Sequence, residues 1–277
     1  MIDFEKIKPL NVLFVGDAII DEYVYVRPIG KSIKENVIST RYESREEFIG
    51  GVGAAAAHVD GLCEQVDVMH GAKVTRNLRY VDSVTMQKLF TLHEAETALV
   101  GQVYDFARYD AVVVTDFGHG AMTKELIRSI TEQAQCIAIN AQTNSQNYGF
   151  NLITKYPRAD YVVVDELEAR LAVHDRDSPI QEVIPKLGFK RGVVTLGANG
   201  AVGFDEFGLH WCDPLTAHPV DTIGAGDAFL AVSSLFAAIG APMHEIVRIG
   251  NAAGAAKCGI VGHRRAVTRA DMEALLA

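Results

Sequence analysis

The chain has too few cysteines to suggest a disulfide framework or a cysteine-rich metal site. Its 277 residues include four, Cys63, Cys136, Cys212 and Cys258, which are far apart and form no C-x-x-C pair. A chain of this length buries a full hydrophobic core without disulfides or metal ions. We therefore expect a protein of the reducing cytoplasm whose stability rests on packing.

Long hydrophobic runs and an excess of positive charge are missing as well. Asp17 interrupts the apolar run at residues 12–20, and no stretch reaches the roughly 18 apolar residues that a membrane span needs. The chain carries 26 Lys and Arg against 35 Asp and Glu, a net charge of −9. This balance argues against binding to nucleic acid or to anionic membranes. We expect neither partner, and an anionic ligand must be held by a local site.

Three common catalytic motifs are incomplete in this sequence. Residues 30–32 read Gly-Lys-Ser, but a phosphate-binding P-loop needs an earlier Gly where Tyr25 stands. The pair His93-Glu94 opens like a zinc-protease helix, yet Thr97 occupies the position of the second His. The G-x-S-x-G turn of serine hydrolases does not occur. These three chemistries therefore have no support.

Short apolar runs rich in β-branched residues alternate with segments of helical periodicity. This alternation predicts an α/β fold with a mostly parallel sheet that is covered by helices on both faces. Ligands of such folds bind beyond the carboxyl ends of the strands. The predicted strands are residues 11–15, 111–115, 136–140, 161–164 and 192–196, and Ala-rich helices are expected at 225–239 and 243–258.

Two stretches depart from this alternation, at about residues 22–49 and 75–93. Polar and apolar residues alternate along both, as in Tyr23-Val24-Tyr25-Val26, which is typical of half-buried strands. We expect a small sheet beside the main body.

The motif that indicates chemistry is Asp-Thr-Ile-Gly-Ala-Gly-Asp at residues 221–227, followed directly by an apolar run. It predicts a glycine-rich turn that opens a helix, where backbone amides and the helix dipole stabilise an anion such as phosphate. A carboxylate beside phosphate is electrostatically costly unless it has a task, and removing a proton from a hydroxyl is such a task for Asp227. The alternative is that Gly224 and Gly226 shape a turn and Asp227 caps a helix. A dinucleotide-binding turn is not supported, because Phe229 stands where its third Gly belongs.

Residues 221–229 resemble the signature of the ribokinase family, the phosphofructokinase-B type sugar kinases. Three other segments are similar to motifs of that family and occur in its order: 15–21, the double glycine at 50–54, and 195–200. The resemblance covers nearly the whole chain. Within the family, residues 16–23, 78–79 and 115–120 are most similar to the heptose-7-phosphate kinase domain of ADP-heptose synthesis enzymes.

The resemblance implies a ribokinase-like three-layer αβα sandwich, with residues 1–277 as one domain. The stretches 22–49 and 75–93 would form a lid over the sugar, and exposed strand edges there would pair two copies into a homodimer. The implied activity is transfer of the γ-phosphoryl group from ATP to a hydroxyl of a sugar or sugar phosphate, with Mg²⁺ present. Such a transition state needs positioning and electrostatic stabilisation.

The resemblance also implies roles for individual residues. Asp227 would be the base, and the amides of Gly224, Ala225, Gly226 and Asp227 the anion hole. The sugar would lie against Asp17, Asp21, Gly50 and Gly51, the nucleotide against Thr195, Gly197, Gly200 and Asn251, and Mg²⁺ near Glu168 and Asp165.

Plainer roles remain open for several of these residues. Asp17 is also placed to cap the turn after a strand. Asp165 and Glu168 also suit an exposed helix start. Asn251, between small residues, also suits pairing with a backbone group.

The sequence departs from the family pattern at three places. The Asn of the double-glycine motif is replaced by Ala54 or Ala55, and His58 either substitutes for it or is a polar residue on an Ala-rich helix. Residues 63–76 are fewer than in typical members, where a further strand and helix intervene, so an edge of the sheet is expected to be lost. Residues 140–142 read Asn-Ala-Gln where relatives often have Asp-Pro.

Two further expectations concern the substrate and the activity. The basic residues Lys31, Lys34 and Arg41 either hold a substrate phosphate or serve solubility. The missing Asn and the short segment motivate an alternative function, a catalytically weak sugar-binding or assembly subunit. The presence of both Asp227 and the glycine turn counts against that alternative. Phosphorylation of a nucleoside or vitamin is less favoured, because those relatives generally lack a two-part lid.

Overall fold

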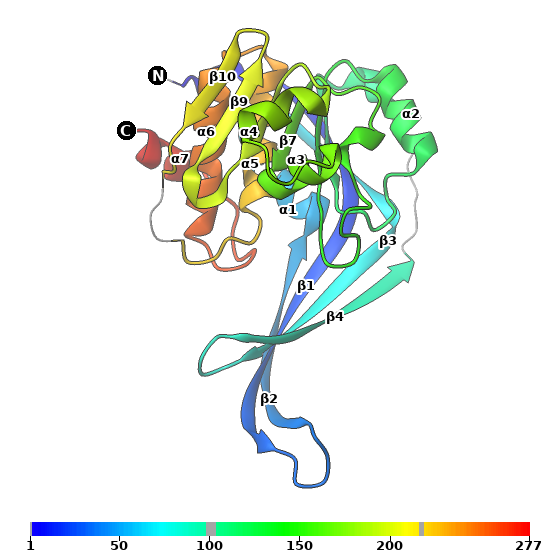
Figure 1. Ribbon diagram of the computed structural model, residues 1–277, viewed down its shortest axis with the longest axis vertical. Coiled ribbons are helices and arrows are strands. Elements are labelled where there is room, and N and C mark those ends of the chain that lie inside the picture. The colour runs from blue at the N-terminus through cyan, green and yellow to red at the C-terminus, as the bar shows by residue number, and fades with distance from the viewer. Residues whose placement is uncertain (1, 98–103, 216–218) are drawn as a thin grey trace.

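A computed structural model describes residues 2–97, 104–215 and 219–277 (Figure 1). Within these ranges ten strands form one sheet in the order β10-β9-β8-β7-β6-β5-β1-β3-β4, and β2 pairs with β1. The strands are β1 (Asn11–Lys31), β2 (Ile38–Gly50), β3 (Gln65–Asp82), β4 (Lys88–Thr97), β5 (Ala111–Asp116), β6 (Ile137–Ala141), β7 (Tyr161–Asp165), β8 (Gly192–Thr195), β9 (Ala201–Asp205) and β10 (Gly208–Cys212).

Helices cover both faces of the main part of this sheet, which confirms the predicted three-layer α/β architecture. Along β1, Val12 and Phe14 join the hydrophobic core on one face, while Leu13 and Val15 join the core on the other. No helix in the described ranges is long and apolar enough to cross a membrane. One face carries α1 (Gly51–Ala57), α5 (Ala225–Ala238), α6 (Met243–Cys258) and α7 (Arg269–Leu276), and the other carries α2 (Lys124–Gln133), α3 (Glu166–Val173) and α4 (Ile180–Val183).

The main sheet is parallel except at one edge. The strands β3, β1, β5, β6, β7 and β8 run parallel, and β9 and β10 are added antiparallel. All five strands predicted from apolar runs are present, as are the two Ala-rich helices. The carboxyl ends of the parallel strands therefore lie together along one rim of the sheet, and the segments that follow these strands meet at that rim.

Two strands run past this rim and form a projecting sheet. β1 pairs with β2 from Ile19 to Lys31, and β3 pairs with β4 from Lys73 to Val81. We call this sheet, residues 18–50 and 74–97, the extension; it projects from the body in Figure 1. It contains both stretches predicted as a small sheet. That sheet is not separate from the main one, because β1 and β3 pass through both.

The short segment at residues 63–76 lies mostly on one continuous strand, β3. Its first part pairs with β1 in the main sheet and its second part pairs with β1 in the extension, with a register shift where Gly16 is opposite His70 and Ala18 is opposite Val74. Residues 71–73 therefore stand opposite Asp17 alone, so this β-bulge contains two extra residues, which bend the strand. β3 is the last strand of the main sheet on this side, beside β1, and no further strand or helix intervenes between its two parts. The expected loss of a sheet edge relative to typical members agrees with this arrangement and stays a prediction.

Candidate active site

A glycine turn opens helix α5 at the edge where the parallel strands end. Gly224 is the N-cap with φ of +75°, a left-handed conformation that favours glycine, and a Cβ there would lie 2.9 Å from Cε1 of His263. The amide of Ala225 donates to the carbonyl of Thr222 at 3.2 Å. Of the predicted anion hole, the amides of Gly226 and Asp227 in the first turn are therefore the better donors for an anion.

Asp227 is buried in the first turn of α5. Its Oδ1 accepts a hydrogen bond of 2.7 Å from Nε2 of Gln142, which follows β6. Burial raises the pKa of Asp227 to about 6, against the lowering effect of His263 and Gln142. A carboxylate with such a pKa is suited to act as a base near neutral pH. Gln142 thus gives a role to the Asn-Ala-Gln segment, for which the sequence offered none.

Asp21 lies buried on β1 at the base of the extension. Its Oδ1 accepts hydrogen bonds from Arg79 at 2.7 and 3.1 Å and from Asn77 at 3.2 Å, both on β3. Burial alone would raise the pKa of Asp21, but His263, Arg79 and Asn77 outweigh it and lower the pKa to about 2. Gly50 is adjacent, since a Cβ there would lie 2.8 Å from Oδ2 of Asp21. Asp21 is therefore a carboxylate over the whole physiological range.

His263 connects Asp21 with the glycine turn, and no motif in the sequence indicated this role. Its Nε2 lies 3.5 Å from Oδ2 of Asp21, and its Cε1 lies against Gly224. The imidazole side chain is almost fully buried. Asp21 and the glycine turn therefore contact one ring from two sides, although the sequence separates them by most of the chain.

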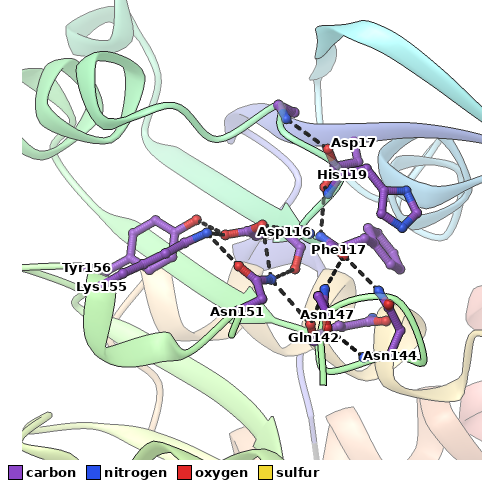
Figure 2. Close-up of polar contacts among 12 residues, drawn as sticks. Asp17, Asp116, Phe117, His119, Gln142, Asn144, Asn147, Asn151, Lys155 and Tyr156 are labelled. Carbon is purple, nitrogen blue, oxygen red and sulfur yellow. Dashed lines mark hydrogen bonds and ion pairs between the residues drawn. The ribbon is translucent and has the colours of Figure 1, made fainter. Parts of the chain in front are cut away.

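Asp17 also lies at this edge, but it faces a loop of its own chain (Figure 2). Its carboxylate accepts hydrogen bonds from the amides of Phe117 at 2.8 Å, His119 at 3.3 Å and Ala121 at 2.9 Å. These bonds hold the loop that follows β5. The geometry supports the alternative in which Asp17 stabilises a turn, and it gives Asp17 less scope for binding sugar.

A second buried carboxylate, Asp116, holds the base of the same loop (Figure 2). It accepts hydrogen bonds from the hydroxyl of Tyr156 at 2.6 Å and from Nδ2 of Asn151 at 3.2 Å, and it pairs with Lys155. Burial, then the neighbouring Asp116, raises the pKa of Tyr156 well above its ordinary value, so its hydroxyl remains a donor. This network fixes the loop rather than presenting free groups to a ligand.

Asp165 and Glu168 form a capping box at the start of α3. Asp165 accepts from the Glu168 amide at 2.7 Å, and Glu168 accepts from the amides of Asp165 and Thr143, both at 2.9 Å. Glu168 is buried. The alternative in which it is an acidic residue at an exposed helix start therefore does not apply. Burial, then the Asp165 carboxylate, raises the pKa of Glu168 to about 8, and a nearby cation would favour its charged form.

The surroundings of Glu168 fit a Mg²⁺ ion. Oδ1 of Asn140 and Oγ1 of Thr143 are buried and have no hydrogen-bond partner in the described structure. Both residues contact Glu168, through Nδ2 of Asn140 at 3.5 Å and the amide of Thr143. Oxygen donors of this kind suit Mg²⁺, which takes few protein ligands and keeps several waters. Among the described residues, no cluster of three or more Asp, Glu, His or Cys side chains is placed to hold a metal ion.

The residues predicted for the nucleotide lie around β8 and α6. Thr195 ends β8, and Gly197 and Gly200 follow it with φ of +57° and +85°. Gly200 packs closely, since a Cβ there would lie 2.1 Å from the carbonyl oxygen of Cys212. Asn251 on α6 donates to the carbonyl of Asp213 at 2.6 Å. This bond supports the alternative in which Asn251 pairs with a backbone group.

The missing Asn of the double-glycine motif is not replaced by His58. Ala54 and Ala55 are buried on α1, and Nδ1 of His58 accepts a hydrogen bond of 3.0 Å from the amide of Val267. Burial lowers the pKa of His58 to about 3, so the ring is neutral. His58 therefore ties α1 to the segment before α7.

The basic residues of the extension lie away from Asp227. Lys31 ends β1, Lys34 lies in the connection to β2, and Arg41 lies near the start of β2. This hairpin tip is the end of the extension farthest from the body (Figure 1). The expectation that these residues hold a phosphate at the site is wrong for a single copy of the chain; Arg76 and Arg79 of β3 lie nearer the site, against Glu22 and Asp21.

The layered body, the projecting strands and the buried Asp at the start of α5 define a class, the ribokinase-like α/β proteins. Two solved structures share the fold. Ribokinase from Thermotoga maritima aligns with a TM-score of 0.71 at 18% identity, covering 96% of this chain and 99% of that chain. The Y23D mutant of phosphofructokinase-2 from Escherichia coli aligns at 0.69 and 17%, covering 96% and 98%.

The family follows from sequence comparison. Residues 63–268 match the pfkB family carbohydrate kinases, and the chain belongs to this family. It is 24% identical over 301 residues to the bifunctional protein HldE of Campylobacter fetus, covering 91% of this chain but 64% of that protein. It is also 24% identical to the D-beta-D-heptose 7-phosphate kinase of Bordetella bronchiseptica, covering 97% and 96%. The chain thus spans less than two thirds of the bifunctional relatives.

Proposed function

We propose that this protein transfers the γ-phosphoryl group of ATP to a hydroxyl of a sugar or sugar phosphate. The observation that carries the proposal is the position of Asp227: buried at a helix start, with a pKa raised to about 6, beside amides suited to an anion. The alternative of a binding or assembly subunit without catalysis gives this buried carboxyl no task.

In this reaction Asp227 accepts the proton of the attacking hydroxyl. Gln142 holds the carboxylate in place through its 2.7 Å bond, so the base is oriented before substrate arrives. Within the glycine turn of residues 224–227, the amides of Gly226 and Asp227 are the main donors to the charge that develops on the transferred group, because the Ala225 amide already donates to the Thr222 carbonyl. The chain thereby supplies the base and the stabilising dipoles from one helical turn.

The sugar lies beside Asp21 and the glycine turn, which the His263 ring connects. The charged Asp21 accepts hydrogen bonds from sugar hydroxyls, and Gly50 and Gly51 allow close approach beside it. Asn77 and Arg79 share this carboxylate, so their side chains extend the polar surface that a sugar meets. Asp17 acts indirectly, by holding the loop after β5.

ATP lies on the side of β8, against Thr195, Gly197 and Gly200, with Asn251 nearby on α6. Glu168, with the oxygens of Asn140 and Thr143, would hold Mg²⁺, and Asp165 orients Glu168 through the capping box. When bound, Mg²⁺ neutralises charge on the phosphate oxygens. Burial of Glu168 makes a cation favourable at that place.

We propose a homodimer joined through the extensions, in the cytoplasm. Several large apolar side chains are exposed on the extension, which supports contact with a second copy. These are Ile29, Ile33, Ile38, Tyr42, Ile49, Phe90 and Leu92. Light scattering at micromolar concentration should give twice the mass of the chain, and a monomeric mass would contradict the dimer.

The acceptor is tested with a panel of hexoses, heptoses and their phosphates, with release of ADP as the readout. A heptose 7-phosphate is the first candidate, because a relative of matching length is named as a kinase for it. Turnover with one acceptor, lost in Asp227→Asn, is the expected result. Binding of a sugar without turnover of any acceptor would instead favour the sugar-binding subunit.

A further inference from the structure

A lysine that has no part in the chemistry above is completely buried next to the glycine turn. Lys257 lies in the last turn of α6 and has no exposed surface. Its Nζ donates to the carbonyl oxygens of Ile223 and Gly262, both at 2.7 Å, and of Ile260 at 3.4 Å. An ammonium group has three N–H donors, so these carbonyls account for all of them.

The three carbonyls join the glycine turn to the chain that follows α6. Ile223 directly precedes Gly224, and a Cβ on Gly224 would lie 3.3 Å from Cε of Lys257. Asp221 connects the same two segments with opposite charge, since it accepts from the amides of Ile223 at 3.1 Å and Gly262 at 2.9 Å. A buried cation and a carboxylate thus fix the turn from which the amides of residues 226 and 227 project.

A buried ammonium is costly, and its cost points to a task. Burial lowers the pKa of Lys257, and the nearby Asp221, Asp227 and Cys258 act in the opposite direction without outweighing it. Side chains of similar volume without charge generally fill such a space at lower cost. They would, however, leave three converging carbonyl oxygens without a partner. Carbonyl oxygens that converge in this way are also the ligands that proteins offer to free monovalent cations.

We propose that Lys257 is a built-in cation that positions the glycine turn, so that the kinase needs no free monovalent cation. The inference deepens the proposed function and rests on it for its catalytic part. Lys257 is a positioning residue: it holds the Ile223 carbonyl and thereby sets the direction of the amides that follow. The positive charge also lies near Gly224 and Asp227, where it would complement negative charge on a group held by the glycine turn.

The first test uses the unaltered protein. Turnover is measured in potassium, sodium and choline chloride at equal ionic strength, and we expect rates within about twofold of one another, because a tethered ammonium cannot be exchanged for the salt cation. A several-fold activation by potassium over choline would overturn the proposal.

The second test empties the cage with Lys257→Ala, purified in ammonium chloride. In choline chloride we expect kcat to fall about 10²-fold while the KM for the sugar changes little, as for loss of transition-state stabilisation. About 100 mM ammonium chloride should restore at least a tenth of kcat, because a free ammonium ion fits between the same carbonyls. The exposed Lys190→Ala is the matched control and should respond to neither change. An unchanged kcat in Lys257→Ala, or no rescue by ammonium, would overturn the proposal.

A third measurement does not depend on finding the acceptor. The melting temperature of Lys257→Ala should rise in ammonium chloride relative to choline chloride, and that of the unaltered protein should not, because only the variant has a cage to fill. If no sugar is ever phosphorylated, the proposed function fails while this measurement still tests the cage. Equal responses of the variant and the unaltered protein would overturn the inference.

Discussion

Nε2 of Gln142 donates a hydrogen bond of 2.7 Å to Oδ1 of Asp227. The donor follows the central strand β6, and the acceptor lies at the start of α5, 85 positions further along the chain. The bond favours the charged form of Asp227 against burial, which acts in the other direction and is larger. The balance of these two effects sets the pH at which the proposed base is ready to accept a proton.

The activity should therefore lose its base as pH falls through about 6, the raised pKa of Asp227. We expect kcat/KM to fall in proportion to acidity below that pH and to level off above it. In Gln142→Leu the carboxylate loses a donor, so the apparent pKa should rise by about half a unit to one unit. The measurement is kcat/KM against pH. The exposed Gln133→Leu is the control and should leave the profile in place. If the acidic limb of the pH profile does not shift in Gln142→Leu, a group other than Asp227 causes that limb.

Asp227→Asn should lose activity and gain stability. The pKa of this carboxyl is about 6 in the folded chain and 3.8 ordinarily, so the folded chain binds the proton more tightly. The free energy of unfolding then falls as pH rises from about 4 to about 6, and the charged form is disfavoured above that range. The asparagine removes this cost and should raise the free energy of unfolding by up to about 3 kcal/mol near neutral pH.

Urea denaturation of Asp227→Asn at about pH 5 and about pH 7.5 measures this effect, with Asp60→Asn on the surface as control. The gain should be larger at the higher pH, because the native carboxyl is then ionised. Turnover should fall by about 10²–10⁴-fold, the usual contribution of a general base. A variant that is less stable at both pH values would mean that the charge of Asp227 is well accommodated in the fold.

Asp17 and Asp21 should differ in what their replacement changes. Asp17→Asn places an NH₂ group against backbone amides that need an acceptor, so the free energy of unfolding should fall by about 1–3 kcal/mol. The KM for the sugar should change little. Asp21→Asn should raise that KM by about tenfold or more, because a charged acceptor of sugar hydroxyls is lost. Chemical denaturation and steady-state kinetics on both variants make the comparison. A KM that rises equally in both would return Asp17 to the sugar site.

Glu168→Gln should weaken the response to Mg²⁺. At fixed ATP, the Mg²⁺ concentration for half-maximal turnover should rise by about tenfold or more, since a carboxylate that interacts with the ion or its waters is removed. Glu166→Gln is a matched control on the same helical turn, where Glu166 pairs with Arg170 instead. Equal Mg²⁺ responses of the two variants would place the ion elsewhere.

Much of the fold could be predicted because it depends on local patterns. The strands β5 to β8 and the helices α5 and α6 are buried because their own residues are apolar, which is visible in the sequence. The length of β1 was not predictable in the same way. Asp17 looks like the end of a strand in sequence, but three amides of another loop satisfy its carboxylate, so the strand continues through it.

The site was predictable only where one segment carries the chemistry. The glycine turn and Asp227 are contiguous, and their spacing indicates their role. Gln142, His263 and Lys257 could not be found, because each acquires its role from a contact with a distant part of the chain. A polar residue whose side chain bonds to a backbone group is equally hard to distinguish, from sequence, from one that binds a ligand. Asn251 is an example.

The bulge at residues 71–73 has a consequence for the side chains beyond it. Successive residues of a strand point to opposite faces, so the number of residues in the bulge decides which residues of β3 face Asp21. With the present number, Asn77 and Arg79 do so. Deleting one residue there would turn these two away and bring Leu78 and Tyr80 into their places. Whether the number of residues in this bulge is odd or even thus decides which side chains of β3 face the pocket, although the bulge itself lies outside it.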